Sequence, residues 1–350
     1  MASSPARETW VDVAKGGAIV LVVLFHAALF LDDVGLAWLW PRAGTALDTF
    51  RMPLFFSTAG LFAAKTLALD LQTVLRRRVA RLVWVYVLWS LVWTLAFQVL
   101  PLLRDVPEWR DLLLLLVWPN PSTWFVYALA LYFVLAWALR PLPAQVQLTA
   151  AATVSAVFGS GTVATGNTAL DKMGMYFVFF LTATLVGPWV RAAARRVRPA
   201  HAALAAGAYV LATGAVFAVG GLGVPGVRLA VGCLAVVFGT ALAVTLAGRR
   251  GFRWLELLGG RTLPVYVLHY YPVLVLCALA EPVAPRLAWA APALPLLLSA
   301  VAIVFSLLVH RVTWRVPGLY ALPTLARPPA TAVGVPVPAR RRARAAEPGP

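Results

Sequence analysis

Residues 16–30 read GGAIVLVVLFHAALF, an apolar stretch that only His26 interrupts. Lys15 stands directly before this stretch, eleven positions ahead of the histidine. At about 100° and 1.5 Å per residue, this spacing places both side chains on one face of a helix, roughly 16 Å apart. A lysine at the start of such a helix reaches the membrane interface. A histidine near the bilayer midplane costs at least a few kcal/mol unless it faces a bundle interior or a wet cavity, so His26 is a functional candidate.

The composition is typical of a polytopic membrane protein. Of the 350 residues, 61% are hydrophobic and 12% are charged, and the mean hydropathy is +0.83. About 20 apolar residues cross a bilayer as a helix, whose backbone groups are paired within the segment. The predicted fold is therefore an all-α bundle of about ten transmembrane helices. The expected spans are residues 16–32, 50–69, 82–101, 122–140, 147–166, 172–190, 200–221, 226–247, 262–281 and 290–312, and the short apolar run 109–118 is expected to lie along the interface.

Ten spans would place both termini on one side of the membrane, and the basic residues indicate the cytoplasm. Most of the 30 lysines and arginines fall in the segments that are then cytoplasmic, which is the bias that fixes orientation during insertion. The net charge of +17 therefore reflects topology and contact with anionic lipids, and no nucleic-acid partner is expected. We expect a cytoplasmic N-terminal segment 1–15, a membrane domain 16–312 and a disordered, Pro- and Arg-rich cytoplasmic tail 323–350.

Several stretches then resemble one family in the correct order. The opening RETWVDVAKG at 7–16, with ten residues between Lys15 and His26, resembles the first helix of the membrane acyltransferase-3 family, which O-acylates sugars and related acceptors. The other matching stretches are RMPLFFSTAG at 51–60, RRRVARLVWVY at 76–86, WFVYALALY at 124–132 and GRTLPVYVLH at 260–269. Ala59, Arg51 and Val85 depart from the Ser, His and Pro that the family commonly has, which affects acceptor specificity more than reaction type.

The chemistry of acyl transfer from coenzyme A to a hydroxyl needs a base, and His26 is the natural choice. Imidazole has a reference pKa of about 6.5, so its neutral form accepts a proton at operating pH. The alternative is a polar ring that a neighbouring helix satisfies. Asp12 and Lys15 are one turn apart and close enough to pair. The resemblance implies that Lys15 meets a phosphate of the donor or holds Asp12 in a polar network, and an interfacial anchor is the alternative.

Two further groups of residues complete the predicted site. Arg78 and Arg81 match the family's Arg-x-x-Arg and would bind the phosphates of acyl-CoA, whereas topology and lipid contact are the alternative. His269 lies one turn beyond Tyr266 in the ninth predicted helix, where Thr262 is expected as a cap. Tyr266 and His269 could support the site. The alternative is that His269 is a packing residue. No metal site is expected, because the four histidines and two cysteines form no cluster with ligand spacing.

The predicted function is transmembrane O-acyl transfer at the plasma membrane. Acetyl-CoA or another acyl-CoA would enter from the cytoplasm as the donor, and a hydroxyl of a sugar, glycan or other acceptor would arrive from outside. His26 would act between them. A transporter or flippase of a lipid-linked sugar shares the polytopic architecture and the buried histidines, and is the alternative.

Overall fold

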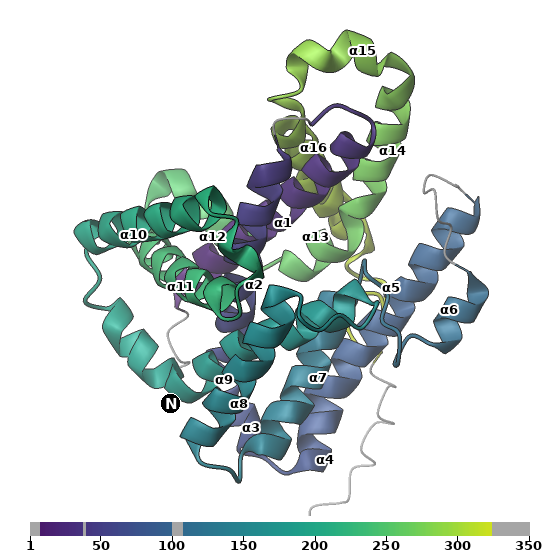
Figure 1. The fold of residues 1–350 in the computed structure, drawn as a ribbon. Coiled ribbons are helices and arrows are strands. Elements are labelled where there is room, and N and C mark those ends of the chain that lie inside the picture. Colours follow the sequence, from purple (N-terminus) through teal and green to yellow (C-terminus); the bar gives the residue numbers. More distant parts are fainter. Residues whose placement is uncertain (1–7, 38–39, 100–107, 324–350) are drawn as a thin grey trace, which may run out of the picture.

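The described part of the chain folds entirely into helices. The structure is a computed structural model that describes residues 8–37, 40–99 and 108–323, and no strand occurs in these ranges (Figure 1). The expected tail 323–350 and the first seven residues lie essentially outside them. The helices are α1 (Thr9–Asp33), α2 (Pro41–Gly60), α3 (Ala64–Leu67), α4 (Leu71–Val74), the π-helical turn η1 (Leu75–Val79), α5 (Ala80–Val99), α6 (Trp109–Leu113), α7 (Trp124–Leu139), α8 (Ala144–Ser160), α9 (Thr168–Ala194), α10 (Pro199–Ala218), η2 (Gly221–Gly223), α11 (Val227–Leu246), η3 (Arg250–Phe252), α12 (Arg253–Gly259), α13 (Thr262–Leu268), α14 (Tyr270–Ala280), η4 (Glu281–Val283), α15 (Ala284–Leu287), η5 (Ala288–Ala290) and α16 (Leu294–Thr313).

Seven helical segments in the described ranges are long and apolar enough to cross a membrane. Each of the ten predicted spans overlaps one helix or a continuous series of helices, but three of these helices do not meet the criteria of length and hydropathy. α7 has 16 residues and α8 has 17, and α2 carries Asp48 and Arg51 in its interior. The protein is thus an all-helical, multi-pass membrane protein. The count of ten spans and the cytoplasmic termini stay predictions.

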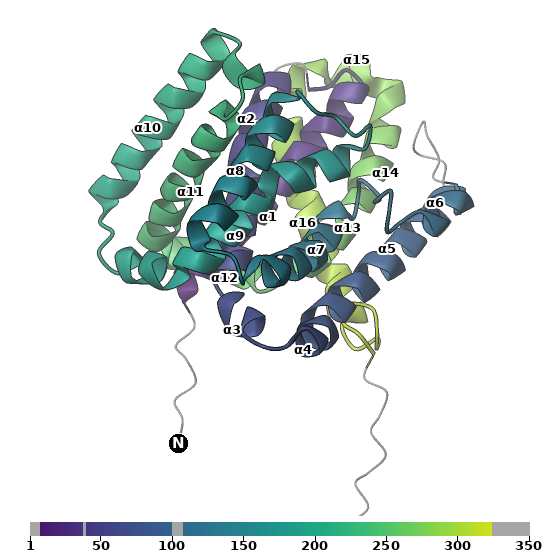
Figure 2. The same ribbon diagram turned by 60° about the horizontal axis from the view of Figure 1, so that its bottom comes forward.

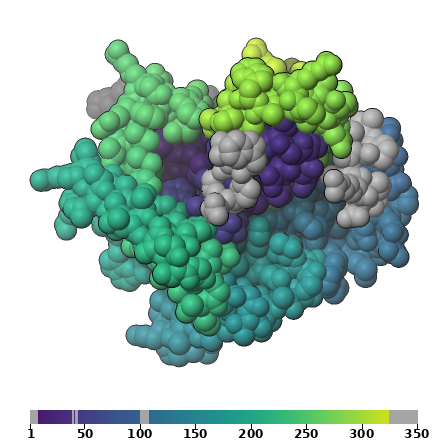
Figure 3. Space-filling model, turned by 45° about the horizontal axis from the view of Figure 1, so that its top comes forward, coloured from purple at the N-terminus to yellow at the C-terminus, as the bar shows by residue number. Residues whose placement is uncertain are grey.

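α1 lies at the centre of the bundle. It contacts α2, α11, α12, α13, α14 and α16 (Figures 1 and 2). Two glycines allow its closest approach to α12, because a Cβ on Gly16 would meet the Leu255 backbone and a Cβ on Gly259 would meet the Asp12 backbone. Figure 3 shows the N-terminal segment, in purple, set between later segments of the chain in green and teal. The middle turns of α1 are therefore surrounded by protein rather than by lipid alone.

α1 begins earlier than predicted, at Thr9 instead of residue 16. Trp10 and Val11 are buried against Leu61, directly after α2, and against side chains of α9 and α11. Asp12 is also buried, so packing extends the helix through a segment that hydropathy alone leaves outside. Residues 9–15 thus continue the helix, and the cytoplasmic location of residues 1–15 stays a prediction. Similarly, α2 begins at Pro41, nine residues before the predicted start, because its first half is too polar to register as a span.

The ninth predicted span is divided into α13 and α14 at His269. Pro272 lacks the N–H that would bond to the Leu268 carbonyl, so the regular hydrogen-bond pattern is interrupted there. Thr262 does not cap the helix. Arg261 occupies the cap position and Thr262 is the first helical residue. The interruption leaves His269 at the junction, with its ring directed toward α1.

Candidate active site

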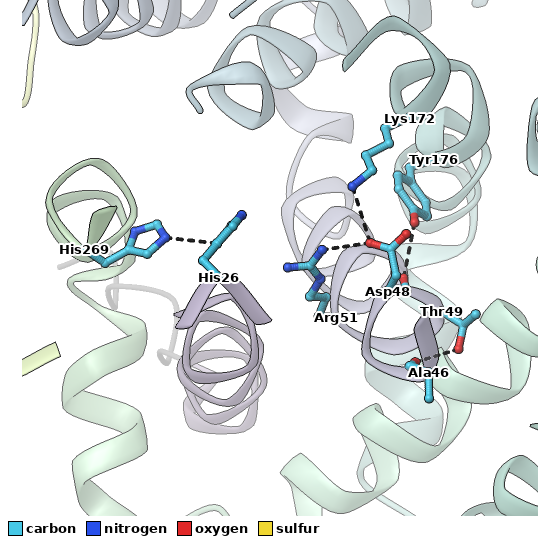
Figure 4. A network of polar contacts seen from close by, with 8 residues as sticks. All are labelled: His26, Ala46, Asp48, Thr49, Arg51, Lys172, Tyr176 and His269. Atoms are coloured by element: carbon cyan, nitrogen blue, oxygen red, sulfur yellow. Dashed lines mark hydrogen bonds and ion pairs between the residues drawn. The ribbon is translucent and has the colours of Figure 1, made fainter. Parts of the chain in front are cut away.

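His26 and His269 meet at the centre of the bundle. Nδ1 of His26 on α1 lies 3.1 Å from Nε2 of His269, a contact between residues that are far apart in sequence (Figure 4). His269 is completely buried, whereas His26 is half-buried. The Tyr270 ring packs against both imidazoles, with centroids 4.5 Å from His26 and 4.6 Å from His269. The structure therefore brings the two intramembrane histidines into one pair.

The hydrogen-bond partners assign a tautomer to each ring. Nδ1 of His269 lies 3.0 Å from the Val265 carbonyl and 2.8 Å from the Tyr266 carbonyl, and a carbonyl only accepts. In the neutral ring Nδ1 is thus the protonated nitrogen, and Nε2 accepts from Nδ1 of His26. Nε2 of His26 is then left without a proton. Figure 4 shows this second nitrogen of His26 pointing away from His269, so the arrangement prepares it to accept a proton.

His26 lines a cavity of about 320 Å³, which we call the histidine cavity. Its walls come from α1, α2, α7, α9, α13 and α14. Many of the lining side chains are aromatic, and Arg51 and Lys172 are the basic residues among the described residues that line it. The cavity places a small molecule against the imidazole. The lining residues are Val22, Phe25, His26, Leu29, Arg51, Met52, Phe55, Pro121, Trp124, Phe125, Thr168, Ala169, Lys172, Tyr266 and Tyr270.

A second cavity, of about 420 Å³, holds the basic residues that the sequence singles out. Lys15, Arg78 and Arg81 all line it, and we call it the arginine cavity. The helical segment of the third predicted span begins at Leu71, before the predicted start at residue 82. The π-helical turn η1 within it places Arg78 on the same cavity as Arg81. Neighbouring arginines Arg76 and Arg77 are exposed and do not line this cavity. The structure therefore separates Arg78 and Arg81, which match the family's Arg-x-x-Arg, from Arg76 and Arg77.

Three aromatic residues, Phe55, Phe125 and Tyr266, line both cavities. Tyr266 is held in place because its hydroxyl oxygen accepts a hydrogen bond of 3.2 Å from the Phe125 backbone N–H. The Phe125 ring packs against Phe55 at 4.6 Å and against Tyr266 at 5.5 Å between centroids. These three side chains, the aromatic wall, therefore separate the arginine cavity from the histidine cavity by a single layer.

One group of charges was not predicted as part of the site. Arg51 donates from Nη2 to Asp48 Oδ1 at 2.8 Å, and Lys172 Nζ lies 3.7 Å from the same oxygen (Figure 4). The Tyr176 hydroxyl donates to the Asp48 backbone carbonyl at 3.2 Å. The sequence does contain a signal, because Asp48 and Arg51 are charges three apart in a span-like segment, and intramembrane charges are functional candidates by default. What the sequence does not contain is the contact with Lys172 on α9.

The remaining predicted residue, Asp12, lines neither cavity. It is 9% exposed and lies where α1 crosses α12. Its predicted pairing with Lys15 stays a prediction. Of the predicted site residues, the structure therefore groups His26 with His269 and Tyr266, groups Lys15 with Arg78 and Arg81, and leaves Asp12 at a helix crossing.

Comparison with known proteins decides the family. Residues 8–311 match the model of the acyltransferase-3 family, which is described as an acyltransferase domain. The chain belongs to the acyltransferase-3 family. No curated protein and no solved structure matches the chain. With its apolar helices, this acyltransferase-3 protein is a membrane acyltransferase, as the resemblance of the first helix indicates.

Proposed function

We propose that the protein transfers an acyl group, in the simplest case acetyl, from acyl-CoA to a hydroxyl of a sugar, glycan or similar acceptor at the plasma membrane. The observation that carries the proposal is the His26–His269 pair beside a cavity. The acceptor hydroxyl gives its proton to Nε2 of His26 while its oxygen bonds to the thioester carbonyl carbon. The carbon–sulfur bond then breaks, the acyl group stays on the acceptor as an ester, and the departing thiolate takes the proton from Nε2.

The arginine cavity fits the donor. Coenzyme A carries a pyrophosphate and a 3′-phosphate, and guanidinium groups bind such oxygens in a bidentate manner. Arg78, Arg81 and Lys15 supply three cationic side chains at one opening. Only the aromatic wall separates this cavity from His26. A thioester at the end of a flexible pantetheine arm could therefore reach the imidazole across that layer, while its phosphates stay with the arginines.

His269 acts as a positioning residue in this scheme. It touches neither substrate, but it fixes which nitrogen of His26 carries the proton. The partners of His269 are backbone carbonyls of its own helix, so its ring cannot turn without losing both hydrogen bonds. Hydrogen bonding of this kind orients a general base, as the buried partner of a catalytic histidine does in hydrolases.

The test is thiol release by the purified full-length protein with acetyl-CoA as the probe. We expect His26→Ala to lower thiol release and ester formation by at least about 100-fold, the low end of what a general base contributes. Its level in the membrane should equal that of the wild type. The matched control is His201→Ala, because His201 is an exposed histidine on α10 that lines neither cavity.

Two results would contradict the proposal. Undiminished thiol release by His26→Ala would remove this residue from catalysis. A wild-type protein that releases no thiol from acetyl-CoA or from longer acyl-CoA, with or without a cell extract as the source of acceptor, would instead favour the transporter or flippase of a lipid-linked sugar.

A further inference from the structure

The charges beside His26 do not balance. Two cationic side chains, Arg51 and Lys172, face one carboxylate, Asp48, and no carboxylate belongs to the described residues that line the histidine cavity. In its neutral form His26 adds no charge, and its contact with His269 does not alter this balance. An uncompensated charge inside a membrane protein is costly, because the low dielectric weakens its solvation. The histidine cavity therefore holds one positive charge more than its own residues neutralise.

Burial and ring stacking fix Arg51 in this position. It is 2% exposed, and its guanidinium lies over the Phe25 ring at 3.6 Å from the centroid. Phe25 immediately precedes His26 on α1, so the stacking fixes the guanidinium plane beside the catalytic candidate. Nη2 is bonded to Asp48, but Nε has no hydrogen-bond partner among the described residues. A buried N–H of a guanidinium without an acceptor indicates that a partner is missing.

Lys172 approaches the same space from another helix. It lies in the first turns of α9, and its side chain is 20% exposed. Nζ also lies 5.7 Å from the Phe25 centroid and 6.0 Å from the Trp124 centroid, so aromatic faces surround it. Asp48 is shared between the two cations at 2.8 and 3.7 Å and cannot neutralise both. Figure 4 shows Arg51, Lys172 and Asp48 converging on the side of His26 that faces away from His269.

From this geometry we propose that the acceptor carries an anionic group, a carboxylate or a phosphate, which Arg51 and Lys172 bind in the histidine cavity. The inference rests on the proposed acyl transfer and names the class of its acceptor. The phosphates of acyl-CoA do not supply this anion, since the arginine cavity on the other side of the aromatic wall holds cations for them. The transient oxyanion of the reaction is the other anion that these cations would stabilise, and it forms equally on a neutral acceptor, so the charge of the acylated product distinguishes the two. Binding the anion places the acceptor hydroxyl against Nε2 of His26.

The experiment identifies the ester that the protein makes in its own cell. The gene is deleted, and mass spectrometry of envelope and secreted fractions finds the ester mass that is lost and that the wild-type gene restores. We expect the acylated molecule to carry a carboxylate or a phosphate. The exact mass and the fragment ions of the lost ester distinguish a phosphate, as monoester or diester, from a carboxylate. An ester on a neutral molecule overturns the inference.

Variants in the same strain test the residues. Lys172 is chosen because its removal still leaves Asp48 paired with Arg51. We expect Lys172→Met to lower the restored ester at least about tenfold, whereas Lys172→Arg keeps most of it. Lys65→Met, an exposed lysine on α3, is the matched control and should equal the wild type. Full ester with Lys172→Met at normal membrane level overturns the binding role of Lys172.

Failure of the proposed acyl transfer gives a different result. In that case deletion removes no ester, or His26→Ala restores the ester as well as the wild type does. A lost ester that depends on His26 but sits on a neutral molecule leaves the acyl transfer intact and removes only the anionic acceptor.

Discussion

At the scale of single residues, the chemistry depends on a contact that joins two distant parts of the chain. His26 is recognisable from the sequence because an imidazole in an apolar helix needs a reason to be there. Its partner is not recognisable in the same way. His269 could be a packing residue by every local criterion, and only the fold shows that its Nε2 faces Nδ1 of His26 at 3.1 Å. In the proposed reaction, this contact gives His26 a defined proton position and leaves its second nitrogen to act as the base.

Replacing His269 should therefore lower kcat without weakening donor binding. In His269→Leu, Nδ1 of His26 loses its acceptor and the ring loses its tautomer, so we expect kcat to fall by about 10- to 100-fold, as when supporting hydrogen bonds of a site are removed. His269→Gln offers an amide oxygen as acceptor and should recover part of the loss. Thiol-release kinetics with acetyl-CoA measure kcat and KM separately. A merely structural role would instead lower the amount of folded protein and leave kcat per folded molecule unchanged in both variants.

Arg81 tests the donor side of the site. It lines the arginine cavity, and a charge-assisted hydrogen bond to a phosphate is worth about 1.5–3 kcal/mol. Arg81→Ala should therefore raise the KM for acetyl-CoA by about 10- to 100-fold with a smaller change in kcat. Arg76→Ala is the control, because Arg76 belongs to the same basic segment but lies outside the cavity. Equal kinetics of the two variants would assign Arg81 to topology and lipid contact.

At the scale of helices, hydropathy predicts where helices lie and packing decides where they begin. All ten predicted spans overlap helical segments of the described ranges, since an apolar run is a property of one segment alone. The helices α1 and α2 begin seven and nine residues before the predicted spans, because neighbouring helices stabilise polar first turns such as the one with Asp12. The Asp48–Arg51–Lys172 group was missed for the same reason. Two of its members are on α2, but Lys172 arrives from α9, and one sequence does not reveal which helices pack together.

The crossing of α1 and α12 offers a test at this scale. A Cβ on Gly259 would meet the backbone of Asp12, which cannot move aside as a flexible side chain could. We expect Gly259→Ala to lower the free energy of unfolding by about 1–3 kcal/mol, the usual cost of overpacking. Gly207→Ala on α10 is the matched control, since a Cβ there has no neighbour within 4 Å and alanine favours the helix by up to about 1 kcal/mol. Thermal unfolding in detergent, followed by tryptophan fluorescence, measures both. Equal midpoints would show that α12 is not held at this distance.

At the scale of the whole molecule, the two cavities lie on opposite sides of the aromatic wall. The arginine cavity is lined from η1, α5 and the first turns of α1 and α13, and the histidine cavity from later turns of α1 together with α9. In the proposed reaction, donor and acceptor would approach the aromatic wall from opposite sides of it. This arrangement fits the division of basic residues in the sequence only if α2 crosses the membrane. α2 does not satisfy hydropathy as a span, since Asp48 and Arg51 lie within it.

Cysteine labelling decides whether α2 crosses. With both native cysteines, Cys233 and Cys277, replaced by alanine, single cysteines are placed at Asp32, after α1, and at Arg76, after α2. Both positions are exposed, and α2 is the one long helix between them. If α2 spans the bilayer and the N-terminus is cytoplasmic, a membrane-impermeant maleimide applied to intact cells labels Asp32→Cys and leaves Arg76→Cys unlabelled until the membrane is permeabilised. Labelling of both positions in intact cells would mean that both lie outside and that α2 does not cross the bilayer. Labelling of Arg76→Cys alone would show that the orientation is the reverse of the predicted one. The arginines that we propose to bind phosphate would then lie outside, where no acyl-CoA is found.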